Sequence, residues 1–328
     1  MIPKRDLLSS PFTLEEIESA RDVVRKSIKP TPQFSWPLLS ERTGGEVFVK
    51  HENHLPTGAF KVRGGVFLLD SLRDLGSLNG LIVATRGNHG QSIAYAGRKA
   101  GIPVHIVVPK DNNSDKNRAM RALGANLIVS GEDFNEAMDF AIQHARKLGL
   151  LFVPSYHTLL VQGVATYAYE LLTSVRNLAT VYVPIGLGSG IAGMIAVRDA
   201  LKLDTEIIGV VAKNANTYRL SFEAGKAIST DSASTLADGL AVRKPDSDAL
   251  EYILRGVERV VEVSEQELNL AIQAIFLDTH NVSEGAGAAS LAGLMKEKDR
   301  QMGKRVSIIL SGGNIDTLTL MSALSLNF

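Results

Sequence analysis

The sequence predicts an α/β protein built on open parallel sheets. From about residue 80 onward, short apolar runs rich in Val and Ile alternate with amphipathic stretches, and glycine-bearing turns follow several of the runs. The runs show little polar alternation, which is typical of strands covered on both faces. At 328 residues the chain is long enough for two domains or one large one.

Each element has a local signal. Strands are predicted at Val47–Lys50, Leu81–Ala84, Val104–Val108, Leu127–Val129, Val181–Ile185, Ile207–Val211, Val260–Val263 and Val306–Leu310. Helices are predicted at 14–26, 89–100, 114–123, 133–148, 158–174, 190–201, 264–280 and 285–298. Gly124 and Gly149 follow predicted helix ends, where a left-handed cap suits glycine. The polar, turn-rich segment 228–248 predicts a surface or active-site loop.

Composition excludes several classes of protein. Lys plus Arg and Asp plus Glu both total 35, so there is no basic excess to favour nucleic acid. The lack of cysteine rules out disulfides, Cys-ligated zinc, iron–sulfur clusters and a catalytic thiol. The polar start and the absence of a long apolar stretch argue against a signal peptide and a membrane span. We therefore expect a cytoplasmic protein with no nucleic-acid or membrane partner.

Three glycine-bearing turns follow predicted parallel strands. The first runs from Thr85 to Ser92 and leads into a helix, whose free N–H groups can hold an anion; a plain turn capped by Asn88 is the alternative. The third is Ser311-Gly312-Gly313-Asn314, a weak signal in isolation. Turns after parallel strands can converge on one crevice at the carboxyl edge of a sheet, where open α/β folds bind ligands.

The second turn, Gly186–Gly193, contains a literal G-x-G-x-x-G. A dinucleotide site requires an acidic residue at the end of the next strand to hold the ribose. That strand ends in Val211-Ala212-Lys213, which has no carboxylate. Nicotinamide or flavin binding is therefore disfavoured, although the turn remains suited to a phosphate.

Lys61 is the candidate nucleophile. It follows Thr57-Gly58-Ala59-Phe60, and Thr57 as an N-cap would place Lys61 in the first turn of a helix. The positive helix end and burial beside Phe60 would both lower the pKa of the lysine toward that of a reactive amine. The alternative is a solvated surface lysine, as most lysines are.

Six motifs, in this order, resemble those of fold-type II pyridoxal-phosphate enzymes, most closely the serine/threonine dehydratase and serine racemase group. They are the Lys61 segment, G-N-H-G-Q, the glycine turn after Ile185, A-D-G-L-A at 237–241, E-G-A-G-A at 284–288 and S-G-G-N at 311–314. The resemblance implies a tryptophan synthase β-like fold with the cofactor in a cleft between two domains. It further implies a large domain of residues 1–79 plus 156–328, a small mobile domain of residues 80–155, no C-terminal regulatory domain and a homodimer.

The resemblance also implies residue roles. Lys61 would be the catalytic residue and would hold pyridoxal 5′-phosphate through a Schiff base. Phe60 would pack on the pyridine ring, Asn88 would bind its hydroxyl and Ser311 would face its nitrogen. The full implied cofactor set is Phe60, Lys61, Asn88, Gly186, Leu187, Gly188, Ser189, Gly190, Gly239, Glu284 and Ser311. Glu284 could equally cap the helix that follows it.

Three further residues are candidates for substrate contact. Arg86 stands where racemases and many dehydratases of the family have a serine, which disfavours racemisation. Arg86 could instead form a bidentate pair with the substrate carboxylate, or it could lie in a structural ion pair. Thr85 and His89 are the other two candidates. The stretch 211–217 lacks the carboxylates with which related racemases bind a divalent cation, so no metal is expected.

The implied reaction is β-elimination from a β-hydroxy amino acid. L-Threonine would give 2-oxobutanoate and ammonia, and L-serine is a second candidate. Dehydration of phenylserine or hydroxyaspartate is the alternative substrate choice. From other classes, a dinucleotide-dependent oxidoreductase is opposed by the missing acidic residue, and a non-catalytic relative is opposed by Lys61.

Overall fold

Two sheets organise the molecule. The computed structural model describes every residue except 1, 3–4, 10, 74–77 and 327–328, so part of the polar start lies outside the described residues. The six-stranded sheet has the order β1 (Gln33–Ser35), β2 (Glu46–His51), β10 (Arg305–Leu310), β7 (Thr180–Pro184), β8 (Glu206–Ala212), β9 (Arg259–Val263). The four-stranded sheet has the order β5 (Asn126–Val129), β4 (Val104–Val108), β3 (Leu81–Ala84), β6 (Leu151–Phe152). All neighbouring pairs are parallel except β1 with β2, which confirms the predicted fold class.

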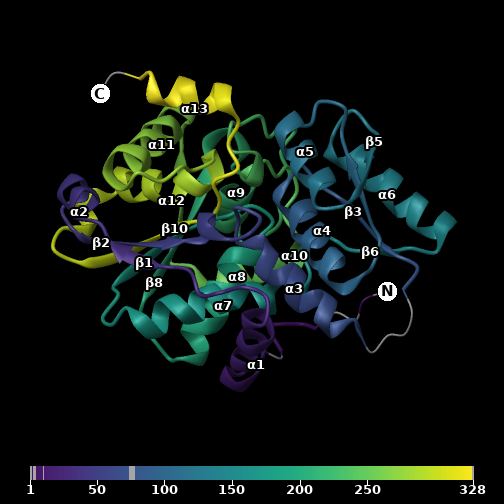
Figure 1. Cartoon of the computed structure of the whole chain (residues 1–328). Helices are drawn as coiled ribbons and strands as arrows, with labels where there is room; N and C mark the ends of the chain where they lie inside the picture. Colours follow the sequence, from purple (N-terminus) through teal and green to yellow (C-terminus); the bar gives the residue numbers. More distant parts are fainter. Residues whose placement is uncertain (1, 3–4, 10, 74–77, 327–328) are drawn as a thin grey trace.

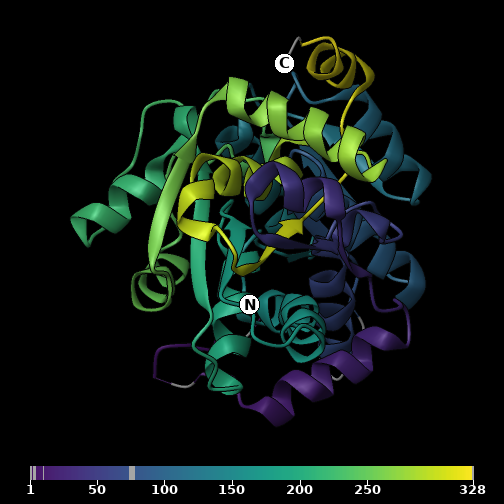
Figure 2. The same cartoon turned by 90° about the vertical axis from the view of Figure 1, so that its left-hand side faces the viewer.

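Helices cover both faces of each sheet (Figures 1 and 2). The helices are α1 (Leu14–Arg25), α2 (Pro37–Thr43), α3 (Lys61–Ser71), α4 (Asn88–Ala100), α5 (Ser114–Ala122), α6 (Phe134–Leu148), α7 (Thr158–Ser174), α8 (Ser189–Ala200), α9 (Thr217–Ala224), α10 (Ser247–Gly256), α11 (Glu265–Thr279), α12 (Gly285–Lys296) and α13 (Thr317–Leu324). Short 3₁₀ turns are η1 (Glu52–His54), η3 (Lys213–Ala215), η4 (Asp238–Leu240) and η5 (Lys298–Gln301). Among the described residues, no helix is both long and apolar enough to cross a membrane.

The apolar strands are buried from both sides. In β7, Val181 and Val183 pack in the core with α7 and α8, whereas Tyr182 packs in the core with α11 and α12. In β3, Leu81 faces α3 and α4, whereas Ile82 faces α6. Because successive side chains of a strand point to opposite faces, unbroken apolar runs are what such a layered arrangement requires.

Local signals set most helix ends. α1 and α11 begin with capping boxes, in which Thr13 pairs with Glu16 and Ser264 pairs with Glu267. Gly149 ends α6 in the left-handed conformation, with a φ of 62°. The sequence patterns do not reveal β1, β6, α2, α9, α10 or α13, and α10 begins inside the segment predicted as a loop.

Candidate active site

The turns after β7 and β10 lie side by side, because these two strands are neighbours in the six-stranded sheet. The segment before α3 joins this edge through an isolated bridge between Ala59 and Gly312. The Phe60 N–H also donates to the Ser311 carbonyl at 3.0 Å. These contacts bring Lys61, the first residue of α3, next to the S-G-G-N turn.

Lys61 is the first residue of its helix, but Thr57 is not the cap. The N-cap residue is Phe60, and the Thr57 hydroxyl instead makes a 3.4 Å contact with the Ala59 carbonyl. The Lys61 Nζ donates to the Ser189 Oγ at 3.0 Å and lies 5.2 Å from the centre of the Phe60 ring. Burial lowers the pKa of Lys61 to about 8.

The loop from Gly186 to Gly190 ends in the first turn of α8. Its N-cap residue, Gly188, has a φ of 98° and supplies no side-chain cap, so the first N–H groups of α8 have no cap acceptor. Tyr218 donates to the Leu187 carbonyl at 3.2 Å, and Tyr167 donates to the Gly190 carbonyl at 2.9 Å. A rigid loop with free N–H donors beside Lys61 fits a phosphate group.

The backbone segments beside this loop are closely packed. A Cβ on Gly186 would overlap the Gly239 carbonyl oxygen, and a Cβ on Gly287 would overlap the Gly312 carbonyl oxygen. Ser311 is 4% exposed, and its hydroxyl makes a 3.4 Å contact with the Ala286 carbonyl. The Ala- and Gly-rich start of α12 therefore serves close packing around the site.

Asn88 links the four-stranded half to the six-stranded half. Its Nδ2 donates to Glu284 Oε1 at 2.5 Å, and its Oδ1 accepts from Asn314 Nδ2 at 2.8 Å. Asn88 is not the cap of α4, because the Thr85 hydroxyl accepts from the Gly87 and Gly90 N–H groups instead. Glu284 is the N-cap residue of α12, yet its side chain makes no capping hydrogen bond there.

The three candidate substrate contacts have different surroundings. Thr85 is buried, and its two accepted bonds leave only its O–H to donate to a ligand. Arg86 lies 3.5 Å from Asp111, at the limit of an ion pair. Burial, followed by the nearby charge of Lys61, lowers the pKa of His89 to about 3, so its imidazole is neutral. Within the described part of the chain, His89 Nε2 has no hydrogen-bond partner.

Two charged groups near the site have no counterpart in the sequence motifs. Lys116, in the first turn of α5, is buried and contacts Asp238 and Glu284. A second cluster lies behind Lys61, where Arg63 pairs with Glu52 and Glu170, and Lys50 also pairs with Glu170. Lys116 stands in a polar stretch, whereas Lys50 and Arg63 stand beside apolar residues, and in neither setting does the local sequence show that these charges are paired in the interior.

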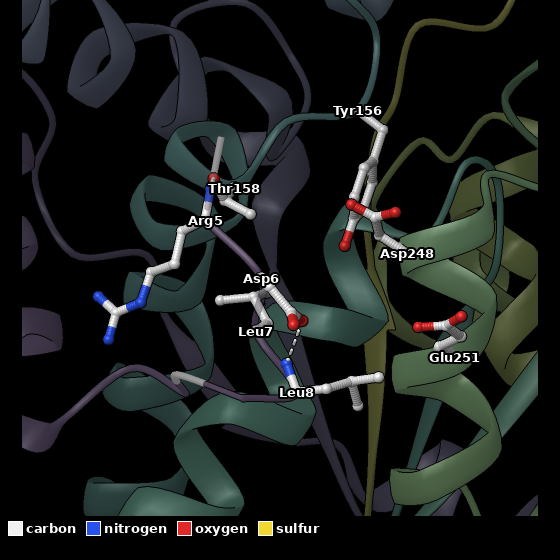
Figure 3. A pocket seen from close by; sticks show the side chains of 8 residues that line it. All are labelled: Arg5, Asp6, Leu7, Leu8, Tyr156, Thr158, Asp248 and Glu251. Atoms are coloured by element: carbon white, nitrogen blue, oxygen red, sulfur yellow. Dashed lines mark hydrogen bonds between the residues drawn. The ribbon is translucent and has the colours of Figure 1, made fainter. Parts of the chain in front are cut away.

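A separate cavity of about 260 Å³ lies between the N-terminal segment, the start of α7 and α10 (Figure 3). Three carboxylates line it, and Asp6 accepts a bond from the Leu8 N–H at 2.9 Å. Its lining residues are Arg5, Asp6, Leu7, Leu8, Tyr156, Thr158, Asp248 and Glu251. None of them belongs to the predicted site.

No group of three or more His, Asp or Glu side chains suited to a metal ion occurs among the described residues. His51, Glu52 and His54, which come close to a metal motif in sequence, instead carry the chain from β2 into η1. The rings of His51 and His54 stack at 4.9 Å, and the Glu52 carboxylate pairs with Arg63.

The fold and the comparisons with known proteins together define a pyridoxal-phosphate dependent enzyme. The family model described as "pyridoxal-phosphate dependent enzyme" matches residues 24–312, and the chain belongs to this family. Within it, an L-threonine ammonia-lyase of Thermotoga maritima is 34% identical over 93% of this chain and 76% of its own.

Solved structures give the same fold. Threonine deaminase isoform 2 from Solanum lycopersicum superposes with a TM-score of 0.87 at 26% identity, covering 98% of this chain and 96% of its own. Maize serine racemase superposes with a TM-score of 0.89 at 26% identity, covering 95% and 96%.

Proposed function

We propose that this protein is a pyridoxal-phosphate dependent ammonia-lyase that dehydrates and deaminates a β-hydroxy amino acid. L-Threonine is the proposed main substrate, giving 2-oxobutanoate and ammonia, with L-serine as a second substrate. The observation that carries the proposal is the desolvated Lys61 amine against Ser189 at the start of α8. The relatives named L-threonine ammonia-lyase support the choice of substrate.

Lys61 is proposed to hold the cofactor and to act as the base. When bound, pyridoxal phosphate draws electrons from the Cα of the attached amino acid, and the protein must then accept the Cα proton. With a pKa of about 8, the Lys61 amine is neutral often enough near neutral pH to take that proton. The buried surroundings of Lys61 keep water from competing for it.

The other implied cofactor residues are proposed to complete the site around Lys61. Gly186, Leu187, Gly188, Ser189 and Gly190 would bind the phosphate, Phe60 would pack on the ring, and Asn88, Gly239 and Glu284 would border it. Ser311 is proposed to face the pyridine nitrogen. A serine hydroxyl does not stabilise a protonated pyridinium as a carboxylate does, so the electron sink is weaker, which suits elimination over transamination.

Arg86 is proposed to bind the substrate carboxylate, with Thr85 and His89 as neighbouring donors. The contact between Arg86 and Asp111 is long, at 3.5 Å, and the Asp111 side chain is largely exposed. Such a pair is weak, so Arg86 could leave Asp111 and pair with the substrate carboxylate instead. The neutral His89 imidazole can donate a hydrogen bond but adds no charge. Of the three candidates, Arg86 is therefore the one whose positive charge would balance the substrate carboxylate.

The deciding experiment measures 2-oxo acid release from L-threonine, L-serine, phenylserine, hydroxyaspartate and their D-forms, with pyridoxal phosphate present. We expect the highest rate with L-threonine. Lys61→Ala should abolish both turnover and the absorbance of the lysine-bound cofactor, and Arg86→Ala should raise KM far more than Arg86→Lys. Preference for another member would replace the substrate, and no release from any member would refute the reaction.

We also propose that the chain forms a homodimer. Large apolar side chains are exposed on adjoining elements of the six-stranded half. They are Phe34 in β1, Leu38 in α2, Leu277 in α11, Val282 after it, and Leu318 and Met321 in α13. Large exposed apolar side chains on adjoining elements are typical of protein interfaces. We further propose that residues 80–155 form a small mobile domain and that residues 1–79 plus 156–328 form a large one.

A further inference from the structure

Lys116 joins the two halves of the molecule at the site. It lies in α5, which packs with the four-stranded sheet, and only 8% of it is exposed. Its Nζ lies 3.2 Å from Asp238 Oδ2 and 3.4 Å from Glu284 Oε2. Both carboxylates belong to the six-stranded half, at η4 and at the start of α12.

The two carboxylates beside Lys116 keep its side chain ionised. Burial by itself would lower the pKa of Lys116, but the charges of Glu284 and Asp238 outweigh it, and the pKa is raised. An ammonium buried to this degree is costly unless it is paired, and removing it would leave two carboxylates facing each other. The contact is therefore a strong constraint on where α5 and η4 can lie.

The two partners of Lys116 lead to opposite ends of the cofactor site. Glu284 accepts from Asn88, so its position bears on the end assigned to the ring hydroxyl. Asp238 precedes Gly239, whose carbonyl oxygen packs directly on Gly186, the first residue of the phosphate loop. One ammonium thus constrains both ends at once.

We propose that Lys116 is a positioning residue that fixes Asp238 and Glu284, and through them the phosphate loop and Asn88, in the geometry that binds the cofactor. The inference rests on the proposed function of this same site. Lys116 acts through its two partners, and its role differs from that of Lys61, which touches the reacting atoms. Without Lys116, the cofactor site loses its alignment while the core of each half remains intact.

A second ion pair between the same two regions provides a matched control. Arg243, three residues after η4, lies 3.5 Å from Asp133, the N-cap of α6. Both side chains are more than 40% exposed, so solvent screens the pair and its loss should matter little. Arg243→Met and Lys116→Met remove the same charge and add the same side chain.

The test compares the wild type with Lys116→Met, Lys116→Arg, Asp238→Asn and Arg243→Met. Pyridoxal-phosphate affinity is measured by titrating the apoprotein and following the cofactor absorbance, with thermal unfolding of each apoprotein as the fold control. We expect Lys116→Met to bind the cofactor about 10- to 100-fold more weakly, by analogy with groups that orient ligand-binding residues. Lys116→Arg should recover part of the loss, and Arg243→Met should stay within about twofold of the wild type.

Asp238→Asn keeps the proposal testable if Lys116→Met fails to fold, because Asp238 lies in a partly exposed turn. It should weaken cofactor binding and, in the loaded enzyme, raise KM more than it lowers kcat. If Lys116→Met binds pyridoxal phosphate as tightly as the wild type, the inference is overturned. Where Lys116→Met does not fold, wild-type cofactor affinity in Asp238→Asn has the same meaning. A loss of cofactor affinity in Arg243→Met as large as that in Lys116→Met would also overturn it. If the wild type itself forms no absorbing complex through Lys61, the proposed function fails instead, so the two failures are distinguishable.

Discussion

The Lys61 amine is reactive because of where its side chain ends. Among the residues that the structure describes, no acidic group pairs with Nζ, which donates to the Ser189 hydroxyl, and burial lowers its pKa to about 8. At pH 7 about a tenth of the side chains would be neutral, against roughly one in three thousand at the ordinary value of 10.5. The fold thus supplies a nucleophile without a neighbouring base.

This shift predicts how cofactor capture depends on pH. The rate at which apoprotein takes up pyridoxal phosphate should rise about tenfold from pH 6 to 7 and level off above a pH of about 8, since only the neutral amine attacks. Stopped-flow absorbance measures this rate. Nα-acetyl-lysine amide, tested in parallel, corrects for the ionisation of the cofactor itself. A protein rate that keeps rising to pH 10, as the model amine does, would contradict the shift.

Sequence motifs locate Lys61, Asn88 and Ser311 because each follows a strand end or opens a helix, and such signals are local. Lys116 could not be found in this way. In sequence it is one basic residue in the polar first turn of α5, and only packing against Asp238 and Glu284 buries it. The alternative in which Asn88 caps α4 could not be decided from the sequence either, because the Asn88 side chain is held by Glu284 of the other half.

Helix α3 is held in place by charges as well as by apolar packing. Arg63 is fully buried and donates to Glu52 and Glu170, which lie in η1 and α7, while Lys50 of β2 donates to Glu170. The two basic and two acidic side chains balance, so the cluster carries no net charge. Because Arg63 lies two residues after Lys61, the cluster also fixes the helix that presents the nucleophile.

Glu170→Gln should therefore destabilise the protein by about 3–5 kcal/mol, because it leaves buried basic groups without one of their two counter-charges. Urea denaturation of the apoprotein measures the free energy of unfolding. Glu132→Gln, which breaks the exposed contact with Lys110, provides the control and should cause little measurable change. Equal effects of the two substitutions would show that burial of the cluster does not matter.

The predicted elements were those with a strong local pattern. Strands β3 and β4 match their predicted bounds residue for residue, because unbroken apolar runs between turn residues leave few alternatives. β6 has two residues and β1 has three, so each exists only through the neighbour with which it pairs. α10 was missed because its start, Asp246 and Ser247, continues a polar stretch typical of loops.

In the whole molecule, several large exposed apolar side chains lie on adjoining elements of the six-stranded half, and α13 carries two of them. On α13, Leu318 is 79% exposed and Met321 is 60% exposed, whereas Ala323 of the same helix is buried. A helix with apolar residues on both faces is typical of one that is covered on both. This supports a second copy of the chain as the cover.

Leu318→Asp should shift the protein toward the monomer, since it would bury a charge in the proposed interface. Sedimentation velocity across a concentration series measures the shift. Leu148→Asp, at an exposed apolar position at the end of α6 in the other half, is the matched control and should leave the assembly unchanged. A wild type that sediments as a monomer at all concentrations would rule the dimer out.

The contact between Gly186 and the Gly239 carbonyl also limits how this protein can vary. No side chain can be added at position 186 unless η4 retreats, and a Cβ on Gly239 would in turn press on Ala286. Replacing a glycine can stabilise a protein by lowering the conformational entropy of the unfolded chain, but only where the folded structure has space for the added side chain. Homologous sequences should therefore keep these three positions small together, and a larger residue at one should be accompanied by an altered loop at another.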